Sequence, residues 1–96
     1  MRKNLETDHK ERRVRAAVHA CRGKEYDRKG MLSEAEGENL QALKILCELC
    51  DDARDQADAV AAGEICEYLA DLCMQGGNMH GADRYYVLAM EYRKRG

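Results

Sequence analysis

Four cysteines are the residues best placed by type and spacing to do chemistry. Cys47 and Cys50 form a Cys-x-x-Cys pair, and Cys66 and Cys73 lie further along the chain. Four thiolates from two neighbouring segments can bind zinc tetrahedrally, but such pairs usually lie on turns, whereas these fall in segments that should be helical. The pair also lacks the βαβ context of a thioredoxin-like redox motif. We expect packing residues, with no metal and no cofactor.

Histidines and carboxylates offer little catalytic chemistry. None of the three histidines has a Ser or Cys nearby in a nucleophile arrangement. Glu64, Glu67 and Asp71 share one helical face and could loosely hold a cation, but no partner helix supplies further carboxylates. No glycine-rich loop follows a strand, so a P-loop is excluded. We predict that the protein is not an enzyme.

The charge of the chain is nearly balanced. Sixteen basic and 18 acidic residues leave a net charge of −2, so no overall field favours nucleic acid or an acidic membrane. Arg12, Arg13 and Arg15 nevertheless form a local basic cluster. A nucleic-acid-associated regulator that uses this cluster is the alternative function, and its binding would weaken steeply with salt.

The compartment is inferred from what the sequence lacks. No apolar run approaches the roughly 20 residues of a membrane helix, and residues 1–6 lack the apolar stretch of a secretory signal. Five cysteines, an odd number, predict reduced thiols in place of a disulfide framework. We expect a cytoplasmic protein.

The elements that must position these residues are helices. The 96 residues contain no proline, and alanine and charged residues dominate. Asp8 with Glu11 resembles a capping box, which predicts a first helix to about Lys29, ended by Gly30. Ser33, followed three residues later by Glu36, predicts the start of the second.

The second half of the chain repeats this order. The polar segment 51–55 breaks the chain after the second helix, and a third helix is expected over about 56–75. Gly76 and Gly77 close it, and a fourth helix is expected over about 81–95. The predicted fold class is therefore all-α, with four helices in two antiparallel hairpins.

The two hairpins match at an offset of 47 residues. Size and polarity agree at this offset where a helical hairpin requires them to. One domain is predicted, with repeat 1 over about 9–50, a linker over 51–55 and repeat 2 over about 56–95. The matched pairs include Val14 with Ala61, Val18 with Ile65, Gly30 with Gly77, Ala35 with Ala82 and Ala42 with Ala89.

These positions resemble the tetratricopeptide repeat. Its signature places an aromatic residue, Leu-Gly and Tyr on the first helix, and Ala and Phe on the second. Small residues are expected where the two helices approach most closely. The corresponding residues are His19, Arg22, Gly23, Tyr26, Ala35 and Asn39 in the first hairpin, and Cys66, Leu69, Ala70, Cys73, Ala82 and Tyr86 in the second.

The spacing between hairpins is similar to the kinesin-light-chain type of this repeat. That type has an Ala-Leu-x-Ile pattern at the end of the second helix, seen here over 42–45, and Val-Ala at the next helix, seen here at Val60 and Ala61. The chain departs from the family at Arg22 and Asn39, where apolar residues are usual, and in lacking the helix-stopping proline. An unrelated pair of helical hairpins is the alternative.

The resemblance implies a protein-binding groove along the first helix of each hairpin. Its second half should be acidic, which favours a partner segment bearing Lys or Arg over a C-terminal carboxylate. An ordinary solvated helix face is the alternative. The predicted groove residues are Lys24, Asp27, Glu64, Glu67, Asp71, Met74 and Gln75, beside Ala17 and Ala20.

The last helix carries a second candidate surface. Tyr85, Leu88 and Tyr92 form a stripe that a further repeat would cover, and Tyr86 should face the other helix of its own hairpin. We expect the stripe to be exposed and to form a homodimer or partner interface, unless it folds back onto the core. The predicted function is a small adaptor, chaperone or inhibitor that binds another protein; a purely self-assembling structural unit is a further alternative.

Overall fold

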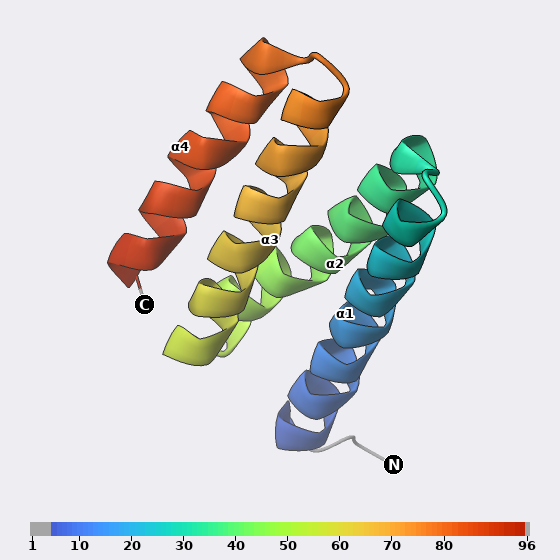
Figure 1. Ribbon diagram of the computed structural model, residues 1–96. Coiled ribbons are helices and arrows are strands. Elements are labelled where there is room, and N and C mark those ends of the chain that lie inside the picture. Colours follow the sequence, from blue (N-terminus) through green and yellow to red (C-terminus); the bar gives the residue numbers. More distant parts are fainter. Residues whose placement is uncertain (1–4, 96) are drawn as a thin grey trace.

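Four helices make up the computed structural model, which describes residues 5–95. They are α1 (Leu5–Arg28), α2 (Leu32–Asp52), α3 (Gln56–Gln75) and α4 (Met79–Arg95), and this part of the chain contains no strand. The helices form two antiparallel hairpins, and α2 packs against α3 (Figure 1). The predicted fold class is confirmed. None of the described helices combines the length and the hydropathy needed to cross a bilayer.

The turns inside the two hairpins are built alike. In the first, the Gly30 N–H donates to the Asp27 carbonyl at 2.9 Å and the Met31 N–H to the Tyr26 carbonyl at 2.9 Å. The second turn has the same two bonds 47 residues later, and Gly30 and Gly77 have φ angles of 77° and 80°. This is the Schellman motif, whose left-handed residue is usually glycine. The repeat offset therefore holds in backbone geometry.

The predicted starts of the first two helices are wrong. α1 begins at Leu5, so Asp8 lies inside the helix, where its carboxylate pairs with Arg12 at 3.3 Å. α2 begins at Leu32, and its N-cap residue Met31 makes no side-chain capping bond. The Schellman turn leads straight into this helix, and so no extended residue remains at Ser33 to act as a cap.

The boundaries of the later helices also shift. α2 continues through Asp52, although carboxylates are unfavourable at a helix C-terminus, because Arg12 donates to Asp52 at 2.8 Å. The connection to α3 is accordingly shorter than the predicted linker, and Asp55 caps α3 by accepting the Ala57 N–H at 2.9 Å. α4 begins at Met79, two residues earlier than predicted.

The larger of two buried clusters takes residues from all four helices and is rich in alanine, and a smaller one lies between α3 and α4. Gly23 is buried where α1 meets α2: a Cβ there would come within 2.2 Å of the Asn39 amide and 3.2 Å of the Ala35 carbonyl oxygen. Ala70 and Ala82, in the second hairpin, are also buried. Small side chains thus let the helices of each hairpin approach closely, as the repeat pattern predicted.

Candidate functional site

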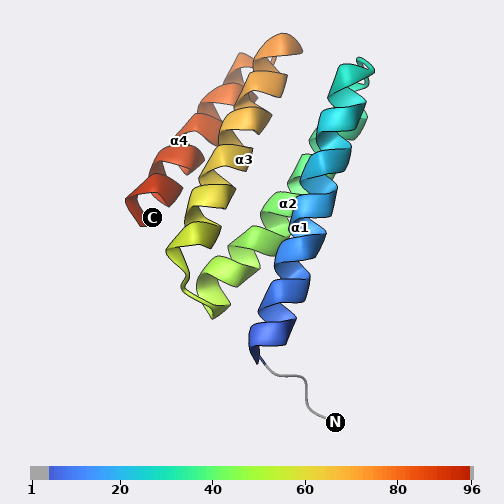
Figure 2. The same cartoon turned by 60° about the horizontal axis from the view of Figure 1, so that its bottom comes forward.

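A groove of about 500 Å³ runs between α1 and α3. The two helices lie side by side and point the same way, with α2 behind the space between them (Figures 1 and 2). Small apolar side chains of α1 and α3 line the groove, and Leu46 and Asn39 come from α2. The lining side chains of the two first helices are Ala16, Ala17, Ala20, Ala61 and Ile65, with Arg13, Lys24, Asp58, Glu64 and Tyr68 as the polar members.

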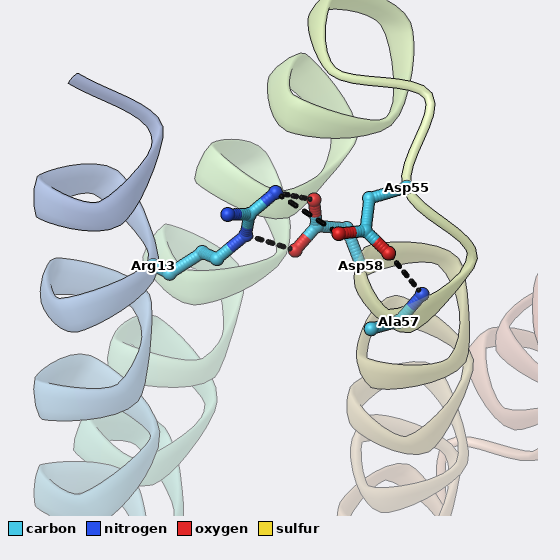
Figure 3. Close-up of polar contacts among 4 residues, drawn as sticks. All are labelled: Arg13, Asp55, Ala57 and Asp58. Carbon is cyan, nitrogen blue, oxygen red and sulfur yellow. Dashed lines mark hydrogen bonds and ion pairs between the residues drawn. The ribbon is translucent and has the colours of Figure 1, made fainter. Parts of the chain in front are cut away.

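Arg13 and Asp58 join α1 to the first turn of α3 (Figure 3). The Arg13 Nε donates to Asp58 Oδ1 and Nη2 to Oδ2, both at 2.8 Å, while Asp55 Oδ2 lies 3.4 Å from Nη2. Asp58 is only 3% exposed, and this bidentate ion pair compensates its buried charge. The hydrogen bond to Asp58 raises the pKa of Arg13. The pair fixes the spacing of α1 and α3 here.

A second bond joins the same two helices nearer their C-terminal ends. The Tyr68 hydroxyl donates to Asp27 Oδ2 at 2.6 Å, although the two residues are 41 positions apart. Burial and this hydrogen bond both raise the pKa of Tyr68. The groove is therefore held along its length by a charged pair in its first part and by a neutral donor to a carboxylate further along.

Two exposed charges on the groove make no ion pair within the described residues. Lys24 projects from α1 and Glu64 from α3, and both line the groove. The surface between them is apolar, which suits an inserted side chain of a bound segment. Charges of opposite sign on the two helices would orient such a segment.

The structure brings together only part of the predicted groove. Lys24 and Glu64 line it, Asp27 supports Tyr68, and Gln75 is exposed at the end of α3. The other three predicted residues lie toward α4.

The structure does not place the predicted acidic residues Glu67 and Asp71 in the groove. Glu67 pairs with Arg93 of α4, and the Tyr86 hydroxyl donates to Asp71 at 2.9 Å and lies 3.5 Å from the Met74 sulfur. α3 turns this stripe away from α1 because its apolar side chains occupy the α1 side.

Arg13, Asp58, Ile65 and Tyr68 are groove residues that sequence reasoning did not identify. The repeat offset does not mark Ile65 as a groove residue, because its equivalent, Val18, does not line the groove. No signal existed for the Arg13–Asp58 pair, whose members are 45 residues apart and depend on how the hairpins meet.

The expected exposed stripe on the last helix is also corrected. Tyr85 and Tyr92 are partly buried against the core, and Tyr92 hydrogen-bonds Cys47 of α2 at 2.5 Å. Only Leu88 of the three counts as exposed. Most of the stripe therefore packs onto the core of the protein, because the two tyrosines of α4 lie on the side of the helix that faces the core. Tyr86 does contact α3, as predicted, although its side chain remains accessible.

All five cysteines are free thiols. Cys66 and Cys73 are buried, and burial raises the pKa of Cys66 to about 11. No group of three or more His, Cys, Asp or Glu side chains within residues 5–95 is placed to hold a metal ion. The arrangement of Cys66 and Cys73 matches that of small apolar packing residues.

No family model, curated protein or solved structure matches the chain. The resemblance to tetratricopeptide repeats stays a prediction from the motif spacing and the 47-residue offset.

Proposed function

We propose that this protein is an interaction module that binds a segment of another protein in the groove between α1 and α3. The observation that carries the proposal is a groove with an apolar floor between two helices. The Arg13–Asp58 ion pair and the Tyr68–Asp27 hydrogen bond hold these helices at a fixed spacing. A surface fixed before binding loses less conformational entropy when the partner arrives.

The partner segment should place an apolar side chain between a basic and an acidic group. Glu64 would pair with a Lys or Arg of the partner, and Lys24 with a carboxylate. The sequence predicted a purely basic partner segment. Because Glu67 and Asp71 lie toward α4, the groove is less acidic than predicted, and the partner segment should carry charges of both signs. We propose that the module acts in the cytoplasm by occupying a partner's surface, as an adaptor, chaperone or inhibitor, and not by catalysis.

Peptide selection followed by NMR would test the groove. Peptides would be selected from a random library on the full chain, and amide chemical shifts would be mapped with the best binder. We expect the largest shifts on the facing residues of α1 and α3, including Ala20 and Ile65. A Glu64→Lys variant should weaken binding about tenfold, equal to about 1.4 kcal/mol, because a rim pair becomes a repulsion.

Glu91→Lys is the matched control, because Glu91 is an exposed carboxylate on α4, remote from the groove. It makes the same charge change and should leave peptide affinity unaltered. Selected peptides whose shifts map away from the groove, or equal losses in the two variants, would overturn the proposal.

Nucleic-acid binding by the arginine cluster is the weaker candidate. Arg12 pairs with Asp8 and Asp52, and Arg13 with Asp58, so two of the three guanidinium groups already have carboxylate partners. Phosphate contacts would have to compete with these pairs.

Self-association through α4 is a second candidate. Val87, Leu88 and Met90 are exposed apolar side chains on this helix, which favours contact with a second copy. A homodimer formed in this way should be lost in a Leu88→Asp variant, as measured by light scattering across a concentration series. An unchanged molar mass in the variant would remove this candidate.

A further inference from the structure

The outward face of α1 carries an uncovered apolar stripe. Val14 and Val18 are 62% and 42% exposed, and Ala17 and Cys21 are exposed beside them. The spacing places these side chains on one face of the helix, away from the buried Ala16. They line a hollow of about 670 Å³ along the helix. α1 forms one edge of the molecule, with its open side turned away from α3 and α4 (Figure 1).

The second hairpin contains the equivalent helix face, on α3. The equivalent positions on α3 line the groove and lie against the first hairpin. In the second hairpin this helix face is partly buried beside α1, whereas in the first nothing within the described residues covers it. The equivalent pairs are Val14 with Ala61, Val18 with Ile65 and Cys21 with Tyr68.

The stripe is surrounded by positive charge. Between residues 10 and 29 of the described chain, six exposed residues are basic and one, Glu25, is acidic. Glu25 is itself paired with Arg28 at 2.6 Å. The whole chain has a net charge of −2, so this face is a local exception, and its complement is an acidic surface. The six basic residues are Lys10, Arg15, Arg22, Lys24, Arg28 and Lys29.

A further copy of the chain fits this face poorly. Ala62 and Leu69 of α3 are fully buried in the core, and their equivalents on α1 are Arg15 and Arg22. Another hairpin stacked in the same register would bury both guanidinium groups, at a high desolvation cost. A single helix that leaves its charged flanks in water avoids this cost.

A lipid surface also fits poorly. Helices that lie in a membrane interface insert large side chains such as Trp, Phe or Leu. The stripe has only valines, an alanine and a cysteine, which suit contact with the side chains of another helix.

We propose that the outward face of α1 docks an acidic amphipathic helix of another protein. Apolar side chains of that helix pack on Val14 and Val18, and its flanking carboxylates pair with Arg15 and Arg22. Ala17 and Lys24 border both this surface and the groove, but Val14, Val18 and Cys21 line only this surface. The docking proposal therefore does not depend on the function proposed for the groove.

Fluorescence anisotropy with designed peptides tests the docking surface. The probe is a labelled helical peptide with leucines spaced three and four residues apart and glutamates on both flanks. We expect it to bind the full chain more tightly than a scrambled peptide of identical composition, and to bind more weakly as salt rises. A Val14→Ser/Val18→Ser variant should lose about tenfold in affinity.

The matched control is Val60→Ser/Met79→Ser, which removes two similarly exposed side chains from α3 and α4. It should bind the probe as the unmodified chain does, and circular dichroism should confirm that both variants are folded. Arg22→Gln, compared with Arg84→Gln on α4, isolates the charge contribution. Equal affinity for the scrambled peptide, or no loss in the α1 variant, would overturn the proposal.

Two further measurements distinguish the other occupants. Co-sedimentation with phosphatidylcholine–phosphatidylserine vesicles that is abolished by Val14→Ser/Val18→Ser would assign the face to a lipid surface. Self-association that disappears in the same variant would assign it to a second copy. Either result would replace the helix proposal, and the absence of both, with selective peptide binding, would support it.

Discussion

Arg13 shows how one residue can set the relation between two hairpins. Its guanidinium spans from α1 to Asp58 in the first turn of α3, and the carboxylate that it meets is almost fully buried. A buried carboxylate without its partner keeps its desolvation penalty and loses the compensating attraction. The pair therefore makes the junction between the hairpins specific, whatever its net contribution to stability.

Replacing Arg13 with alanine should destabilise the fold. We expect a loss of about 2 kcal/mol in the free energy of unfolding, less than for a fully buried pair because Arg13 is partly solvated. Urea denaturation would measure it. A double variant, Arg13→Met/Asp58→Leu, should recover most of the loss, because no unpaired charge is left buried. A double variant no more stable than the single one would contradict this account.

Cys66 should make stability fall at alkaline pH. Burial raises the pKa of Cys66 from 9.0 to about 11, so the unfolded chain releases this proton at a lower pH than the folded chain does. The stabilisation is complete below about pH 9 and is lost as the pH rises through about 11. Denaturation across this range should show the decline, with a smaller slope in Cys66→Ala. Equal slopes in Cys66→Ala and the unmodified chain would disprove it; Cys21→Ala, at an exposed site, is the control.

Element by element, glycine defines the hairpins in two different ways. Gly30 and Gly77 occupy left-handed positions in equivalent turns, where a side chain would be strained. Gly23 has no such backbone requirement; it is needed because α2 lies so close that a Cβ would meet the Asn39 side chain. Asn39 cannot move freely, since its amide donates to the Ala35 carbonyl at 2.8 Å in a buried site.

Two glycine-to-alanine changes should have opposite effects. Gly23→Ala should cost about 2 kcal/mol, because the new methyl group overpacks the contact between α1 and α2. Gly37→Ala should stabilise the protein by about 0.5–1 kcal/mol, because α2 is open at this position and alanine favours a helix. Thermal melting would show the melting temperature falling in the first variant and rising in the second. Shifts in the same direction would refute this reading of the contact.

Across the whole molecule, the core joins the hairpins into one unit. Leu46 from α2, Cys66 and Leu69 from α3, Ala16 from α1 and Ala89 from α4 belong to one buried cluster. Neither hairpin can bury its apolar face alone, as expected for stacked helical repeats. Unfolding of one hairpin should therefore expose the other.

Leu69→Ala tests this coupling. We expect a loss of about 3 kcal/mol, typical of a fully buried leucine replaced by alanine. Native-state hydrogen exchange should show faster exchange for the slowest amides of both hairpins, including those of α1, because they share the core. Acceleration confined to α3 and α4 would indicate two independently stable hairpins.

The sequence by itself determined the helices, the two hairpins, the repeat offset and the positions of close approach. These features depend on local propensity, on glycine in the turns and on periodic small residues, all of which act within one hairpin. Capping residues were misread at Asp8 and Ser33, because Asp8 instead forms an ion pair and a backbone turn serves in place of Ser33.

Only the tertiary structure decided which side chains form the groove and which face α4. Arg13 meets Asp58 and Tyr68 meets Asp27 across more than 40 residues, and these contacts depend on the angle at which the hairpins pack. Within the second hairpin, Glu67 and Asp71 meet side chains of α4, and the packing of the hairpins places Tyr92 beside Cys47 of α2. A small rotation of a helix moves a side chain from one surface to another, and helical periodicity does not fix that rotation.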